Sequence, residues 1–130
     1  MSESGYYELD ITVPAQPCYL RQLRDLVRSF GLDCGAAEGR VVDMVMAANE
    51  ACANVMQHAY GEGRGPLHLR GWRERHGLVF EISDNGTPVA EPVPGRVGGR
   101  GIPLIRELSE EVDIEGPGEY GTRLAIRFNL

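Results

Sequence analysis

A carboxylate, an amide and an imidazole recur at four-residue spacing in this 130-residue chain, at Glu50, Asn54 and His58. At about 3.6 residues per turn, the three positions lie on one face of a helix. The rest of that segment is largely apolar, and buried polar groups are costly unless something pairs with them. Glutamate can accept a proton, and an asparagine oxygen suits a hard cation such as Mg²⁺. The stripe therefore indicates either a site for a polar, metal-carrying ligand or a face that contacts water.

Two glycine-containing segments follow along the chain. Asp84 is expected at a strand end, two residues before Gly86, where it can accept a hydrogen bond from an exocyclic amine while the glycine permits close approach. Residues 95–101 are rich in glycine and run into a helix, whose N-terminus presents free N–H groups and a favourable dipole to phosphate. Each segment alone is common in turns and connectors, so their order carries the information.

Composition excludes several classes of function. The net charge is −6 and the sequence pI is about 5.0, which argues against direct binding of nucleic acid or a membrane surface. All 13 basic residues are arginine, so neither a P-loop lysine nor a Schiff-base lysine is available. The three cysteines, Cys18, Cys34 and Cys52, have no metal-type spacing and are interpreted as reduced packing residues. With no membrane-length apolar run and no signal sequence, we expect a cytoplasmic protein.

The elements that must position these residues are those of one domain spanning 1–130. Strands are expected over 7–13, 67–75, 78–84, 111–115 and 123–130, and helices over 15–30, 36–59 and 102–108. Gly31 is expected to end the first helix. Because most strand neighbours are joined by tight turns, this order of elements predicts an α+β fold. The predicted fold has a mixed, mostly antiparallel sheet with helices layered on one face.

The motifs, taken in order, resemble the GHKL (histidine-kinase-like) ATPase superfamily, whose members share the Bergerat ATP-binding fold. Glu50 with Asn54 resembles the N box, Asp84 with Gly86 the first glycine box, Gly99 with Gly101 the second, and Gly121-Thr122 the pair that completes the adenine pocket. Within the superfamily the chain is most similar to the anti-sigma-factor serine/threonine kinases of bacterial partner-switching systems. The resemblance extends from about residue 11 to the C-terminus.

This resemblance implies binding of Mg²⁺-ATP and phosphorylation of a serine or threonine on a STAS-type anti-anti-sigma antagonist. It also implies ATP-linked sequestration of a sigma factor, and it suggests a homodimer. Under it, Glu50 is the general base and Asn54 holds Mg²⁺. The resemblance also implies a set of nucleotide-binding residues besides Asn54. These are Asp84, Gly86 and Thr122 for adenine, and Gly99, Arg100 and Gly101 for the phosphates.

Some features depart from the superfamily pattern and leave alternatives open. Thr87-Pro88 follows Gly86 where a further glycine is frequent, and residues 87–98 are short for an ATP lid. Arg96 and Arg100 meet phosphate in place of a lysine or remain solvated, and His58 either contacts the nucleotide region or closes its helix. The alternatives to the kinase are a non-catalytic or ATP-switched protein-binding module, and a kinase of this family acting on a different output protein. The intact Glu50 argues against the non-catalytic module.

Overall fold

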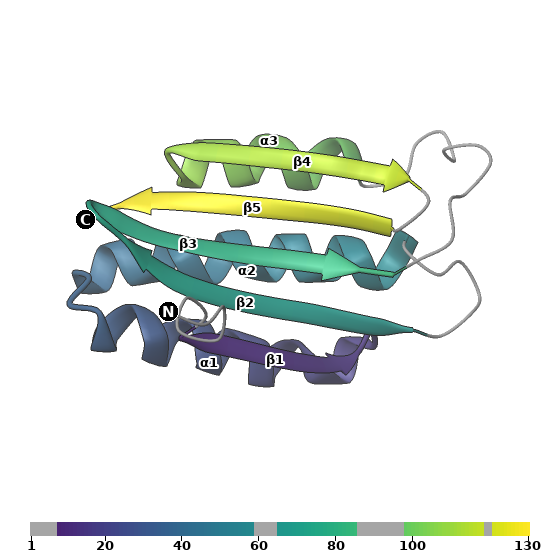
Figure 1. Ribbon diagram of the computed structural model, residues 1–130, viewed down its shortest axis with the longest axis horizontal. Coiled ribbons are helices and arrows are strands. Elements are labelled where there is room, and N and C mark those ends of the chain that lie inside the picture. The colour runs from purple at the N-terminus through teal and green to yellow at the C-terminus, as the bar shows by residue number, and fades with distance from the viewer. Residues whose placement is uncertain (1–7, 59–64, 86–97, 119–120) are drawn as a thin grey trace.

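The described residues form a five-stranded sheet with helices on one face (Figure 1). The structure is a computed structural model and describes residues 8–58, 65–85, 98–118 and 121–130. In chain order the elements are β1 Leu9–Pro14, a 3-10 turn Pro17–Tyr19, α1 Leu20–Asp33, α2 Glu38–His58, β2 Pro66–Glu74, β3 Gly77–Asp84, α3 Gly98–Leu108, β4 Glu111–Gly118 and β5 Gly121–Asn129. The predicted α+β arrangement is confirmed. Within these residues, no helix is long and apolar enough to cross a membrane.

The strand order is β1-β2-β3-β5-β4, and every described pairing is antiparallel. The parallel component of the expected mixed sheet is therefore not seen among the described strands. The last strand, β5, pairs with β3 on one side and β4 on the other, with Ser83 opposite Arg123. This register brings the end of β3 beside the start of β5, and these two strands meet at the site described below.

The core lies between the sheet and the helices. Alternate residues of the central strands point toward the helices and are fully buried, among them Phe80, Ile82 and Phe128, as the two-residue period of a strand requires. The Phe80 and Phe128 rings meet edge to face with centroids 6.0 Å apart. Cys52 on α2 belongs to this core, and its burial raises the pKa of the thiol to about 12. The central helix α2 is thus held across the middle of the sheet.

The prediction that the first helix ends at Gly31 is wrong, because α1 continues to Asp33. Gly31 is buried, and a Cβ atom there would lie 3.1 Å from Met44 Sδ and 3.2 Å from a methyl carbon of Val41. The glycine therefore allows α1 and α2 to pack closely and does not stop the helix. The chain instead reverses at Gly35, which has a φ of 87° and donates its N–H to the Leu32 carbonyl.

Other boundaries move by a few residues. The third helix, α3, begins at Gly98 and not at residue 102, so part of the glycine-rich segment is helical. The strand expected over 111–115 extends to Gly118, and the last strand begins at Gly121. Helix α2 ends at His58, and Ala59, which was expected within it, lies outside the described residues.

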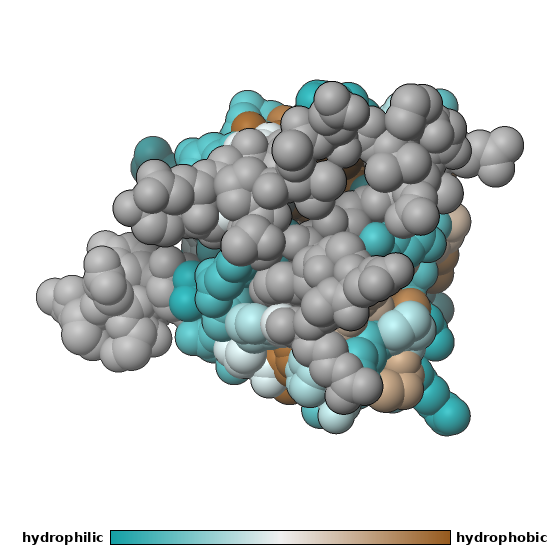
Figure 2. All heavy atoms as spheres, turned by 90° about the vertical axis from the view of Figure 1, so that its right-hand side faces the viewer, coloured by the Kyte–Doolittle hydropathy of each residue, from teal (hydrophilic) through white to brown (hydrophobic). Residues whose placement is uncertain are grey.

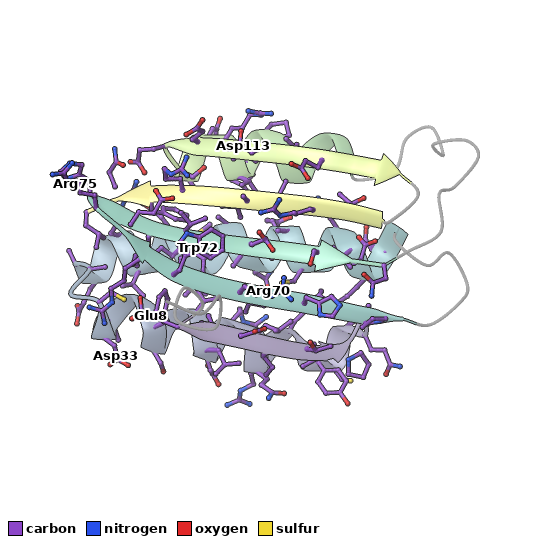
Figure 3. The ribbon with its side chains drawn as sticks, in the orientation of Figure 1. Glu8, Asp33, Arg70, Trp72, Arg75 and Asp113 are labelled. Atoms are coloured by element: carbon purple, nitrogen blue, oxygen red, sulfur yellow. The ribbon has the colours of Figure 1, made fainter. Side chains whose placement is uncertain are left out.

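The sheet face away from the helices is covered by ion pairs (Figure 3). Glu81 is only 3% exposed there and accepts hydrogen bonds from Arg123, with Nε 2.7 Å from its Oε2. Arg70, which points to the same side, lies 3.6 Å from Glu81. Arg127 bridges Glu74 and Glu111 further along. The long arginine side chains thus shield the centre of this face in place of helices.

Candidate functional site

Glu50 and Asn54 lie one turn apart on α2, and both are half-buried. The neighbouring amide, Asn49, is already paired, because its Oδ1 accepts a hydrogen bond from Arg24 Nη1 at 3.0 Å. Neither Glu50 nor Asn54 makes a hydrogen bond or an ion pair within the part of the chain that the structure describes. Among the described residues, this partly desolvated carboxylate and amide therefore keep hydrogen-bonding capacity that a ligand could use.

Asp84 and Thr122 come together through the pairing of β3 with β5. Asp84 is the last residue of β3 and is 4% exposed, and its Oδ1 accepts a hydrogen bond from the Thr122 N–H at 3.2 Å. The preceding residue, Gly121, has a φ of 90°, and a Cβ atom there would lie 2.5 Å from Asp84 Oδ1. Gly121 is thus required both by its backbone conformation and by the space that the Asp84 carboxylate occupies.

The first turn of α3 includes Gly99 and Gly101, with Arg100 between them. The leading N–H groups of a helix have no partner within the helix, and they attract anions. Arg40 Nη1 on α2 donates to the Leu108 carbonyl at 3.0 Å, which places the end of α3 beside the start of α2. Because α2 and α3 run in opposite directions (Figure 1), the start of α3 lies toward the C-terminal half of α2.

These parts share one end of the molecule. The C-terminal ends of α2 and β3 and the first residues of α3 and β5 all lie at the right-hand end in Figure 1. Figure 2 looks onto this end, and the described residues visible there are mostly hydrophilic. Of the predicted site residues, Gly86 lies outside the described residues, as does Arg96, and the structure gives no side-chain placement for Arg100 or His58.

The structure adds one row of hydrogen-bonded side chains that the sequence analysis did not single out. His68 on β2 lies between β1 and β3, with Nδ1 2.9 Å from Thr12 Oγ1 and Nε2 3.4 Å from Asn85 Nδ2. Asn85 directly follows Asp84, so these hydrogen bonds support the strand end that carries the Asp84 carboxylate. A single sequence offers no signal for it, because the contact depends on the register of three strands.

Comparison with known proteins identifies the class. Residues 13–128 match the family model of the histidine kinase-like ATPase domain, and the chain belongs to this family. The serine-protein kinases RsbW of Bacillus thuringiensis (strain Al Hakam) and Bacillus anthracis are each 25% identical to it over 124 residues, which cover 84% of this chain and 78% of the relative. The resemblance to the GHKL superfamily and to its free-standing serine kinases is thereby confirmed.

A solved structure supports the same fold. The RsbU and RsbW domains of Rv1364c from Mycobacterium tuberculosis superpose with a TM-score of 0.75 and 22% sequence identity. The match covers 94% of this chain but only 32% of that longer chain. The likeness therefore confirms the predicted Bergerat-type fold of the domain.

Proposed function

We propose that this protein is an ATP-dependent serine/threonine protein kinase that also sequesters a sigma factor, with a STAS-type anti-anti-sigma antagonist as its substrate. The observation that carries the proposal is the pair Glu50 and Asn54. Both are half-buried, and neither has an internal partner within the described residues. The end of α2 that carries them and the start of α3 lie at the same end of the molecule (Figure 1). Similarity to the RsbW kinases supports the choice of reaction.

The residues at the end of β3 fit an adenine base. The buried Asp84 carboxylate can accept a hydrogen bond from the exocyclic amine, and the Thr122 N–H fixes its orientation. Gly121 lets the Asp84 carboxylate keep this position, which a side chain at residue 121 would contest. The first turn of α3 would receive the phosphates on its free N–H groups, with Gly99 and Gly101 permitting close approach.

The residues on α2 fit the transfer chemistry. Asn54 would hold Mg²⁺ through its amide oxygen, since this ion takes few protein ligands beside phosphate oxygens and water. When bound, the ion neutralises the negative charge that phosphoryl transfer concentrates on the phosphate oxygens. Glu50 would accept the proton of the serine or threonine hydroxyl as that oxygen bonds to phosphorus and the terminal phosphate leaves ADP.

Titration calorimetry with Mg²⁺-ATP and Mg²⁺-ADP tests the nucleotide part of this proposal. We expect the parent protein to bind both nucleotides. Asp84→Asn should lower the affinity about tenfold or more, because the amide lacks the charge that strengthens the bond to adenine. Asp113→Asn, an exposed change on β4 (Figure 3), is the matched control and should bind like the parent. A folded parent that binds neither nucleotide contradicts the proposal.

A further inference from the structure

A histidine with both ring nitrogens in contact with polar groups lies beside the strand end that carries Asp84. His68 on β2 is half-buried, and its neighbours Leu67 and Leu69 are fully buried in the core. The imidazole is therefore attached to a part of the sheet that core packing holds in place. The end of β1, the start of β2 and the end of β3 lie together at the end of the molecule that carries the candidate site (Figure 1).

The two contacts of this ring require the neutral imidazole. Nε2 of His68 lies 3.4 Å from Asn85 Nδ2, and because an amide nitrogen only donates, Nε2 must accept. The ring proton is then on Nδ1, which donates to Thr12 Oγ1 at 2.9 Å. Protonation would make both ring nitrogens donors, so that Asn85 would have to turn its amide or move away. The contact with Asn85 thus depends on the protonation state of the ring.

Strand pairing ends just before Asn85. The register of β3 with β2 ends at Asp84, and the register of β3 with β5 ends at Ser83. Asn85 joins Asp84 to Gly86, and the family resemblance assigns both of these neighbours to adenine. A hydrogen bond from β2 to the Asn85 side chain therefore restricts the direction in which the chain leaves Asp84.

The charged side chains on this face of the sheet are engaged with one another. Leu67 and Leu69 face the core, so His68 between them faces the opposite side, as Arg70 does. Two residues further along their strands, Arg70 Nε lies 3.5 Å from Asp10 Oδ1, and Arg70 Nη1 lies 3.6 Å from Glu81 Oε1. The helices cover the other face of the sheet (Figure 1), and Asp84 points to that other face.

We propose that His68 is a positioning residue for the nucleotide. Its neutral imidazole holds Asn85 so that Asp84 is presented to the base, and acidification releases this contact. The inference rests on the proposed binding of a nucleotide at Asp84. Histidine changes its charge between about pH 5 and 8, so the contact is present at the upper end of this range and lost at the lower end. His68 acts through Asn85 and does not itself touch the nucleotide.

Substitutions at residue 68 separate the two ring contacts. His68→Gln keeps an acceptor near the position of Nε2, His68→Asn keeps a donor near the position of Nδ1, and His68→Leu keeps neither. Titration calorimetry with Mg²⁺-ADP at about pH 8, where histidine is neutral, measures the affinity. We expect His68→Gln to bind like the parent. His68→Asn and His68→Leu should bind about threefold to tenfold more weakly, which is the effect of one lost hydrogen bond. His76→Leu, at the exposed turn between β2 and β3, is the matched control and should bind like the parent.

The pH dependence of the affinity distinguishes positioning from a purely structural role. Relative to His68→Gln, the parent should lose about threefold to tenfold in ADP affinity between about pH 8 and about pH 5.5. The phosphates of ADP and the other histidines titrate in the same range, but both proteins contain them, so the ratio of the two affinities isolates His68. Urea unfolding at each pH shows whether a change in affinity merely follows a change in stability.

Several outcomes overturn the proposal. These are equal affinities of His68→Leu and the parent, an equal loss in His68→Gln and His68→Leu, or a ratio of parent to His68→Gln affinity that does not change with pH. A loss in His76→Leu as large as that in His68→Leu would also overturn it. A folded parent that binds no ADP contradicts the proposed nucleotide site and the positioning role with it. A parent that binds ADP regardless of residue 68 contradicts the positioning role alone.

Discussion

At the start of α2, Arg40 uses its guanidinium group inside the protein, whereas Glu50 and Asn54 in the second half of the same helix have no hydrogen-bond or ion-pair partner among the described residues. Arg40 donates to the Leu108 carbonyl at 3.0 Å and to Asp43 at 3.2 Å, and it pairs with the Glu110 carboxylate. Its guanidinium carbon also lies 5.0 Å from the centre of the Phe128 ring. One side chain thereby joins the start of α2 to the end of α3 and to the last strand.

Glu50 and Asn54 differ from Arg40 in every one of these respects. Both are half-buried, and neither has a hydrogen bond or ion pair among the described residues. Partial desolvation without a partner costs stability, and such costs are typical of functional sites. The difference indicates that the Arg40 side chain contributes to the fold, whereas the Glu50 and Asn54 side chains are candidates for binding a ligand. Changes at Arg40 should therefore affect stability, and changes at Glu50 should affect chemistry.

The largest effect is expected for Glu50→Gln, which keeps the shape of the side chain and removes its basicity. Phosphoryl transfer from ATP to the antagonist should fall by about two orders of magnitude or more, while ATP affinity changes little. Single-turnover transfer of labelled phosphate measures the rate. Glu38→Gln, at the exposed start of α2, is the control and should react like the parent.

Two other outcomes of this experiment are informative. Transfer by Glu50→Gln at the parental rate would remove Glu50 from the role of general base. A parent that binds ATP but transfers phosphate to no STAS-type antagonist from the same genome would instead support an ATP-switched binding module.

Asn54→Ala distinguishes the proposed role of Asn54 from that of Glu50, because it should lose the Mg²⁺-dependent part of nucleotide binding together with activity.

A second large effect is expected at the end of the candidate site that carries Asp84. Gly35→Ala and Gly121→Ala each place a side chain at a positive φ, which costs about 1–2 kcal/mol. At Gly35 nothing lies within 4 Å of the added Cβ, whereas at Gly121 it meets Asp84. Gly121→Ala should therefore lose more stability and also nucleotide affinity, measured by urea unfolding and calorimetry. Equal stability losses with unchanged ADP binding in both variants would show that Gly121 does not shape the site.

Arg40→Met tests the structural half of the comparison. Removing the guanidinium leaves Asp43, Glu110 and the Leu108 carbonyl without it, so we expect a loss of about 2 kcal/mol in the free energy of unfolding. Nucleotide affinity should stay at the parental value at temperatures where the variant is folded. Arg106→Met is the control and should change stability by less than about 0.5 kcal/mol. Loss of ADP binding without loss of stability would contradict the structural role of Arg40 and its contrast with Glu50 and Asn54.

The fold could be predicted from the sequence because local signals and their order agree. Periodicity and turn residues predicted the α+β arrangement, and the motif order indicated the family. Gly31 was misassigned because a glycine at a helix end and a glycine at a helix contact look alike in sequence, and only the packing of Met44 and Val41 distinguishes them. The start of α3 was placed too late because glycine has a low helix propensity that tertiary context overrides here.

Within the site, the family resemblance placed Asp84 and Thr122 in one pocket, but the sequence did not reveal how they meet. Their hydrogen bond follows from the pairing of β5 with β3, which the sequence order alone does not determine. The contacts of Asn49 with Arg24 and of Asn85 with His68 likewise depend on helix packing and strand register. The assignment of Glu50 and Asn54 as base and Mg²⁺ ligand stays a prediction, and the variants above test it.

The smallest effect is expected on the open face of the sheet, where Glu74 is paired with Arg127. Arg127 Nε donates to Glu74 Oε2 at 2.8 Å, and this hydrogen bond lowers the pKa of Glu74 from its usual value of 4.5. A lowered pKa in the folded state means that the pair stabilises the protein above about pH 4.5. That contribution is lost as the pH falls through the folded-state pKa.

Glu74→Gln should therefore reduce the free energy of unfolding by less than about 1 kcal/mol near neutral pH, because the pair is partly exposed to water. The difference from the parent should shrink as the pH falls through the folded-state pKa of Glu74, because the carboxylate then becomes protonated in both folded and unfolded chains. Urea unfolding at neutral pH and at a series of acidic pH values measures it, with the exposed Glu107→Gln as control. Because Glu74 lies on β2 at the end of the sheet away from Asp84, ADP affinity should not change. A difference that grows on acidification would show that Glu74 is not stabilised as a carboxylate.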